Sequence, residues 1–146
     1  MSDDKGIAVR CMTLNDLCRA ENFLNFRVRK KIGNEEASFP LEILPKTGLS
    51  CFEDGKLLAV ATCYLERSAP VAVCGWCISA PGNTPQQSKR AVRALLAAMP
   101  DYASSFGARY LLTTFGNRGI NRIAADLGYK FGEKCVNMFM FLEKKE

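Results

Sequence analysis

The groups best suited to chemistry gather where a predicted strand gives way to a predicted helix. Residues 71–79 are apolar and β-prone, and a turn signal over residues 80–83 ends the strand. Thr84 can then cap a helix, with Pro85 at its first position and Gln87 placed to complete a capping box. Such a helix start directs unpaired N–H groups and the positive end of the helix dipole outward. It can therefore bind an anion, although most turns of this kind bind nothing.

The sequence excludes several other kinds of site. Its 146 residues include no histidine, which removes the commonest acid–base residue and rules out a Ser-His triad. Cys74 and Cys77 form a Cys-x-x-Cys pair, but residues three apart in a strand point to opposite faces, so their sulfurs would meet only across a strong bulge. Zinc would need two further ligands, and no second pair of this kind exists. We therefore predict packed thiols and no metal site.

Length and composition favour a single domain, residues 1–146, with a substantial core. Hydrophobic residues make up 48% of the chain and charged residues 24%, which is typical of a globular protein without a membrane helix. Seven cysteines at scattered apolar positions, and a polar first segment unlike a secretory signal, favour a reduced cytoplasmic protein. The net charge of +5 weakly favours an anionic partner.

Hydrophobic periodicity predicts the elements that position these groups. A strand over 7–12 precedes a helix that begins after Thr13 and ends before Gly33. The strands that follow cover 49–52, 57–65 and 71–79, the first two joined by an Asp-Gly hairpin turn. Pro100 should kink or end the helix after Thr84, and residues 101–106 are expected to continue helically. One face of this helix is made of Val92, Leu95, Leu96, Met99 and Phe106. The remaining predicted elements are a strand over 109–115, a helix over 121–127, and strands over 129–132 and 136–142.

Two polar stretches have both a structural and a functional interpretation. The cations at the end of the first helix, Arg27, Arg29, Lys30 and Lys31, could bind phosphates, but such a run is more often a solvated helix end. We therefore do not expect a nucleic acid as a partner. Residues 34–48 show no clear period, and they form either a mobile substrate loop or a short helix with a connector.

The order of these elements resembles that of the GNAT superfamily of N-acetyltransferases over nearly the whole chain. Residues 117–129, from Asn117 to Gly128-Tyr129, resemble the family's Asn-(x)n-Leu-Gly-Phe passage in spacing. Residues 86–91 resemble the two ends of its Arg/Gln-x-x-Gly-x-Gly/Ala loop. The resemblance implies an α/β, GNAT-like fold: a mixed, mostly antiparallel twisted sheet of seven strands with helices on both faces.

The resemblance also implies where acetyl-CoA would bind as the co-substrate. In the family, the loop backbone approaches the pyrophosphate, and the central strand pairs with the pantetheine arm. The corresponding positions here are the backbone of Ile78, Ser79 and Ala80, the helix start formed by Gln86, Gln87, Ser88, Lys89, Arg90 and Ala91, and Asn117. Lys89 replaces the middle glycine of the loop. Either Lys89 or Arg90 binds phosphate through its charge, or these side chains fill the pocket.

Gly75 has two interpretations within this resemblance. It could mark the bulge that separates the central strand from its neighbour, or it could simply allow close packing.

The family's chemistry needs a base to take a proton from the amine and an acid to protonate the leaving thiolate. The central strand carries no carboxylate, so Glu66 is the candidate base, with Glu35 and Glu36 as alternatives. Ala124 occupies the family's tyrosine position, so Tyr129 is the candidate acid, with Tyr102 as an alternative. Surface solvation for the carboxylates and core packing for the tyrosines are the structural alternatives.

The sequence leaves two main functions open, and a third that is weaker. The first is direct, acetyl-CoA-dependent acyl transfer to an amine of a small molecule or a protein. The second is a catalytically inactive GNAT-fold protein that serves as a binding or regulatory partner, and a basic nucleic-acid-associated module is a weaker third. The apolar segment 136–142 could pair with a second copy to form a homodimer. The short chain with its altered loop also resembles bacteriophage-encoded members of the superfamily.

Overall fold

A single mixed sheet forms the centre of the molecule in a computed structural model that describes residues 6–33, 41–115, 117–132, 140 and 142. Its strand order is β1-β2-β3-β4-β5. The first four strands pair antiparallel, and β4 and β5 pair in parallel because a helix crosses over between them. The strands are β1 (Ile7–Cys11), β2 (Gly48–Glu53), β3 (Lys56–Leu65), β4 (Val71–Ser79) and β5 (Tyr110–Thr113).

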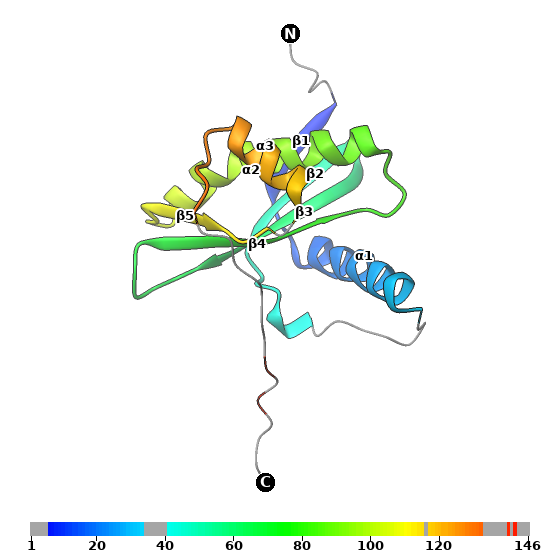
Figure 1. Cartoon of the computed structure of the whole chain (residues 1–146), viewed down its shortest axis with the longest axis horizontal. Helices are drawn as coiled ribbons and strands as arrows, with labels where there is room; N and C mark the ends of the chain where they lie inside the picture. Colours follow the sequence, from blue (N-terminus) through cyan, green and yellow to red (C-terminus); the bar gives the residue numbers. More distant parts are fainter. Residues whose placement is uncertain (1–5, 34–40, 116, 133–139, 141, 143–146) are drawn as a thin grey trace.

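Helices cover both faces of this sheet, as the sequence predicted (Figure 1). On one face lies α1 (Leu14–Ile32), followed by the short helix η1 (Leu41–Ile43), and on the other lie α2 (Pro85–Ser105) and α3 (Arg118–Asp126). The core beneath α1 is built around Leu17, Ala20, Leu57, Val60 and Ile78. The core beneath α2 and α3 is built around Leu58, Ala61, Leu95, Leu96 and Met99. No helix in the described part of the chain is both long and apolar enough to cross a membrane.

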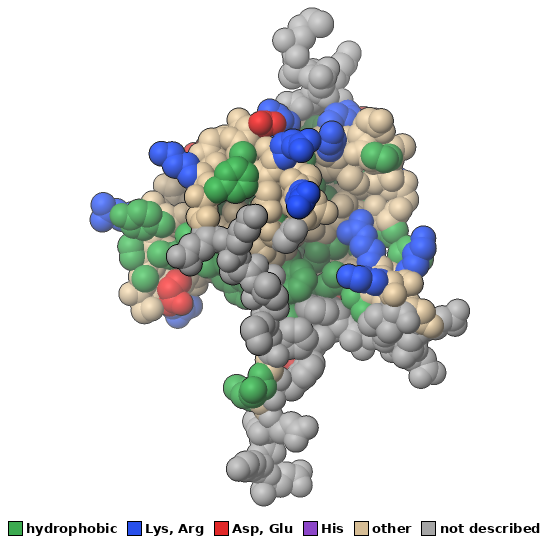
Figure 2. All heavy atoms as spheres, viewed as in Figure 1, with side chains coloured by type: hydrophobic (Ala, Val, Ile, Leu, Met, Phe, Trp, Pro, Cys, Tyr) green, Lys and Arg blue, Asp and Glu red, His purple; other side chains and the backbone are tan. Residues whose placement is uncertain are grey.

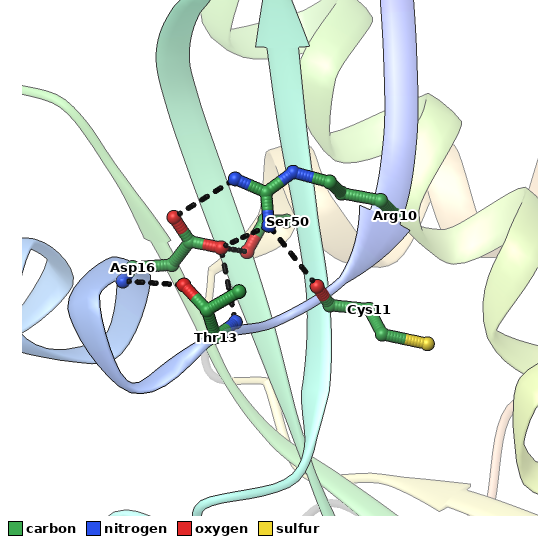
Figure 3. Close-up of polar contacts among 5 residues, drawn as sticks. All are labelled: Arg10, Cys11, Thr13, Asp16 and Ser50. Atoms are coloured by element: carbon green, nitrogen blue, oxygen red, sulfur yellow. Dashed lines mark hydrogen bonds and ion pairs between the residues drawn. The ribbon is translucent and has the colours of Figure 1, made fainter.

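The start of α1 is fixed by a polar cluster beneath it (Figure 3). Thr13 is the predicted N-cap, and it forms a capping box with Asp16; the Ser50 hydroxyl donates to Asp16 Oδ2 at 2.9 Å. Arg10 lies 3.0 Å from the same oxygen, and its guanidinium also stacks on Phe52. Burial of Asp16 would raise its pKa, but the hydrogen bonds from Thr13 and Ser50 and the charge of Arg10 outweigh burial and lower it.

A β-bulge in β4 changes which side chains of the strand face each core. Thr62 of β3 pairs with Trp76 and Tyr64 pairs with Val73, so one residue of β3 lies opposite two residues of β4, Cys74 and Gly75. Cys74 packs beneath α2, whereas Trp76 packs beneath α1. Simple alternation along a strand would have put both side chains on one face.

Three sequence predictions about the elements need correction. Residues 129–132 form no strand. Phe106 is 57% exposed, because α2 ends at Ser105 and the helical spacing stops there; its ring packs edge-on against Tyr102 instead. The described sheet has five strands and not seven, and the predicted strand 136–142 lies outside the described residues except for Met140 and Leu142. The continuation of α2 past Pro100 is confirmed.

Candidate functional site

The parallel strands β4 and β5 diverge partway along β4. Their pairing covers residues 71–74 of β4 and all of β5, whereas β4 continues to Ser79. Beyond Cys74, no strand of the described sheet pairs with this edge of β4. The outward-facing N–H and C=O groups of residues 75–79 are therefore available to an extended ligand.

The hydrogen-bond pattern on the other side of β4 shows which residues face outward. The Ala80 N–H donates to the Leu58 carbonyl of β3 at 2.8 Å. Because alternate residues of a strand point their N–H and C=O groups to opposite sides, Ile78 also faces β3, and Cys77 and Ser79 face the open edge. Of the three predicted backbone contacts, Ser79 is thus the one that the open edge presents, and Cys77 joins it.

Gly75 lies where the two strands begin to separate, and both interpretations of this residue hold. It belongs to the bulge opposite Cys63, as described above. A Cβ atom on Gly75 would lie 3.3 Å from Tyr64 Cε2 and 3.7 Å from Thr114 Oγ1, so the position is also tightly packed. The bulge and the divergence of the strands coincide at this residue.

The start of α2 is largely closed by its own capping interactions. Gln87 N–H donates to Thr84 Oγ1 at 3.1 Å, and Thr84 N–H donates to Gln87 Oε1 at 2.9 Å. Pro85 has no N–H. Within the described contacts, Gln86 alone of the first-turn residues keeps a free backbone N–H. The capping box predicted from the sequence is confirmed, and it uses the donors that an anion would need.

Two of the predicted cofactor contacts are bound to β2 instead. Arg90 forms an ion pair with Glu53 at 2.5 Å, and Gln87 Nε2 donates to the second carboxylate oxygen at 3.1 Å. The hydrogen bond from Gln87, followed by the charge of Arg90, lowers the pKa of Glu53. The charge of Arg90 is therefore balanced by Glu53 in the absence of a ligand.

The other predicted residues of this helix start differ in accessibility. Ala91 is fully buried in the core, and the Ser88 hydroxyl accepts from Asn83 at 3.3 Å. Gln86 and Lys89 are exposed. Lys89 could therefore bind a phosphate without breaking an ion pair, whereas Arg90 could not.

Cations of α1 lie at the end of β4. Arg27 Nη2 donates to the Ser79 hydroxyl at 3.4 Å, a contact between residues 52 positions apart. Arg29, Lys30 and Lys31 follow in the last turn of α1. Figure 2 shows Lys and Arg side chains gathered at the right of the molecule, over the end of α1. The last residue of β4 therefore lies against a positively charged helix end.

Glu66 and Tyr129, the predicted catalytic pair, are placed apart and engaged elsewhere. Glu66 follows β3, and its carboxylate accepts from the backbone and hydroxyl of Ser68 and the backbone of Arg67, which lowers its pKa. It lies near the beginning of β4, roughly 20 Å along the strand from Ser79. The Tyr129 hydroxyl donates to the Leu96 carbonyl at 2.8 Å, and burial strongly raises its pKa.

The alternative acid, Tyr102, is also engaged in the core, and the alternative bases are not described. Tyr102 accepts from the Gly48 N–H at 3.0 Å, and burial raises its pKa. Glu35 and Glu36 lie outside the described residues.

Tyr64 was missed by sequence reasoning although it lies beside the bulge. Its ring contacts Gly75, its hydroxyl donates to the Ile43 carbonyl of η1, and its side chain is 38% exposed. Together with Thr47, Val73 and Glu66 it lines a hollow of about 1050 Å³. Tyr64 lies beside the bulge because of the register between β3 and β4. No local pattern in the sequence predicts that register.

The bulge also brings Cys74 and Cys77 to the same face of the sheet, which alternation alone did not predict. Both thiols are free. Burial raises the pKa of Cys77 to about 12, partly opposed by the charge of Arg27, and raises that of Cys74 further. No group of three metal-ligating side chains occurs among the described residues. The two residues behave as packed, protonated thiols.

Asn117 acts as the N-cap of α3. Its side-chain oxygen accepts from Gly119 N–H at 2.8 Å and from Ile120 N–H at 3.2 Å. The helix begins three residues earlier than predicted because of this cap. A contact between Asn117 and a cofactor stays a prediction.

Comparison with known proteins gives a fold but no sequence family. No protein-family model matches the sequence, and no curated protein matches it. An aminoglycoside acetyltransferase from an uncultured soil metagenomic sample, solved in complex with sisomicin, matches with a TM-score of 0.69 and 13% identity, over 97% of this chain and 100% of that one.

Two further solved structures match over most of this chain. The Salmonella typhimurium protein yncA, with its cofactor acetyl-CoA, matches with a TM-score of 0.63 and 17% identity over 86% of this chain and 80% of that one. A ribosomal-protein-alanine N-acetyltransferase from Brucella melitensis matches with a TM-score of 0.63 and 12% identity over 92% and 99%. At these identities the likeness concerns the fold, and the chain has the GNAT-like α/β fold predicted from its sequence.

Proposed function

We propose that this chain is a divergent member of the GNAT superfamily that transfers an acyl group from acetyl-CoA directly to an amine of a small molecule or a protein. The observation that carries the proposal is the open edge of β4. It begins at the bulge near Gly75 and ends at Ser79, beside the start of α2. Solved structures of the same fold support it: one contains acetyl-CoA, and others are an aminoglycoside acetyltransferase and a ribosomal-protein-alanine N-acetyltransferase.

The open edge fits the pantetheine arm of acetyl-CoA. That arm is extended and contains two amide groups, so it can pair with the outward N–H and C=O groups of Cys77 and Ser79 as an added strand would. Acetyl-CoA would supply an activated acyl group: a C–N bond to the amine forms and the C–S bond breaks. The amine loses a proton to a base, and the released thiolate gains one.

The candidate acid and base remain part of the proposal. Tyr129 keeps its proton at neutral pH, as a donor must, but it donates to Leu96. Glu66 is ionised, yet a carboxylate with a lowered pKa is a weaker base. Glu66 also lines the hollow that Tyr64 shares at the bulge, so an amine bound there would lie between them.

A second function is favoured by the start of α2. The capping box and Pro85 occupy or remove most of its donors, and Ala124 stands where the resemblance places the acid. A GNAT-fold protein that binds a partner without catalysis would tolerate both features. Acetyl-CoA affinity separates the two functions.

The test uses two substitutions at one outward-facing residue. Ser79→Pro removes an N–H from the open edge without removing a hydrogen bond to β3, and proline is tolerated at such edges. Ser79→Ala retains the N–H and loses only the hydroxyl. Titration calorimetry with acetyl-CoA should show binding by the unmodified chain, a loss of about tenfold for Ser79→Pro, and less than about threefold for Ser79→Ala.

Mass spectrometry of an amine mixture incubated with acetyl-CoA should then reveal an acetylated product. The absence of both heat and thermal stabilisation at millimolar acetyl-CoA, in a folded protein, would leave the non-catalytic function. Equal affinity of the two Ser79 variants would mean that the cofactor does not use this edge.

A further inference from the structure

The phosphates of an acyl-CoA would find few donors on α2. The capping box uses the N–H groups of Thr84 and Gln87, and Pro85 has none, which leaves Gln86 in the first turn. Arg90 is bound to Glu53. A diphosphate held only by one N–H group and Lys89 would keep much of its charge uncompensated.

The structure places a further cation at the same end of β4, from the opposite face of the sheet. Arg27 is exposed on α1, and its guanidinium reaches the hydroxyl of Ser79. The charge of Arg27 also partly opposes the rise that burial causes in the pKa of Cys77, a second residue of the open edge. Arg27 therefore lies at the end of the open edge, in contact with Ser79.

The present partner of Arg27 is easily replaced. At 3.4 Å the bond to Ser79 is long, its acceptor is neutral, and it is exposed to solvent. A phosphate offers charged oxygens in the geometry that a guanidinium fork binds best, with shorter and stronger hydrogen bonds. Replacing the Ser79 hydroxyl by a phosphate as the partner of Arg27 should therefore favour cofactor binding.

We propose, on the basis of the function proposed above, that Arg27 of α1 binds the diphosphate of the acyl-CoA where it passes the end of β4. The phosphate site then draws on both layers of helices: Arg27 from α1 on one side, and Gln86 N–H with Lys89 from α2 on the other. Bound cofactor would link α1 to α2 across the end of the sheet.

The test compares Arg27→Ala with Lys30→Ala, which removes the same charge from the last turn of α1 without a described contact to β4. Three probes are titrated: acetyl-CoA, acetyl-dephospho-CoA, which lacks the 3′-phosphate, and acetyl-pantetheine, which lacks all phosphates. Arg27→Ala should weaken acetyl-CoA binding about tenfold or more, and Lys30→Ala less than about threefold. Arg27→Lys, which keeps the charge but loses the fork, should fall between Arg27→Ala and the unmodified chain.

The probes separate the alternatives. The loss in Arg27→Ala should persist with acetyl-dephospho-CoA and vanish with acetyl-pantetheine. A loss that disappears with acetyl-dephospho-CoA would assign Arg27 to the 3′-phosphate and overturn the inference. An equal loss with acetyl-pantetheine, or no loss with acetyl-CoA, would overturn it as well. Failure of the unmodified chain to bind any probe would instead count against the proposed function.

Discussion

Arg90 of α2 lies 2.5 Å from the carboxylate of Glu53, the last residue of β2, so one of the two cations near the start of α2 is balanced within the protein. This pair lies beside the helix start that the sequence suggested as an anion site. It therefore limits the positive potential available there.

Replacing Glu53 should improve cofactor binding at a small cost in stability. Glu53→Gln removes the negative charge and frees Arg90, so the acetyl-CoA dissociation constant should fall about two- to threefold at low salt. The thermal midpoint should drop slightly, because the ion pair is lost. Asp101→Asn, the same charge change in a later part of α2, serves as the control and should alter neither quantity. Weaker binding by Glu53→Gln would mean that Glu53 positions Arg90 for the ligand.

Asp16 should be essential for stability. Asp16→Asn would leave the hydrogen bonds of Thr13 and Ser50 without a charged acceptor, and we expect a loss of about 2–3 kcal/mol in the free energy of unfolding by urea. Ser50→Ala should cost about 1 kcal/mol. A loss for Asp16→Asn no larger than that for Ser50→Ala would contradict this account.

The same carboxylate predicts a pH dependence. The folded-state pKa of Asp16 is lowered below the usual aspartate value, so its contribution to stability is fully present above the unfolded-state pKa. That contribution is lost as the pH falls through the folded-state value. The difference in urea midpoint between the unmodified chain and Asp16→Asn should therefore be constant from pH 7 to about pH 5 and shrink below about pH 4.

The bulge at Gly75 should tolerate no added side chain. Gly75→Ala places a Cβ atom 3.3 Å from Tyr64, and the resulting displacement should cost about 1 kcal/mol or more. Gly82→Ala is the matched control because nothing lies within 4 Å of its Cβ position, and its effect should stay within about 0.5 kcal/mol. Similar urea midpoints for the two variants would show that Tyr64 moves aside freely.

Thiol labelling should separate the cysteines into two classes. In the native protein, Cys11 and Cys18 are exposed and should react with a maleimide within minutes, whereas Cys74 and Cys77 should react at least about a hundredfold more slowly. Peptide mapping with and without 8 M urea gives the site-by-site rates. Rapid labelling of Cys77 in the native protein, or a Cys74–Cys77 disulfide under mild oxidation, would contradict the prediction of packed thiols and support a redox function.

Local contacts were predictable from the sequence, and distant ones were not. The capping box at Thr84 and the N-cap at Thr13 depend on residues within one helical turn, so residue types alone predicted them. Arg27 and Ser79 are 52 positions apart and meet only through the packing of α1 on the sheet. Residues 129–132 have strand-like composition but form no strand, because composition does not provide a pairing partner.

The candidate site shows the same division. The glycine in the central strand pointed correctly to a bulge. The sequence could not show which residues of β4 point their backbone groups toward β3. The hydrogen bond from Ala80 N–H to the Leu58 carbonyl shows that Ile78 and Ala80 do so, and that they do not face the open edge.

The extra residue in β4 moves the even-numbered side chains of that strand from one core to the other. Before it, Ala72 and Cys74 pack beneath α2; after it, Trp76 and Ile78 pack beneath α1. Substitutions that reshape the hollow near Val73 and Tyr64 therefore need not disturb the packing of the strand end that holds Ser79. Under the proposed function, acceptor specificity could change during evolution while the binding of acetyl-CoA is retained.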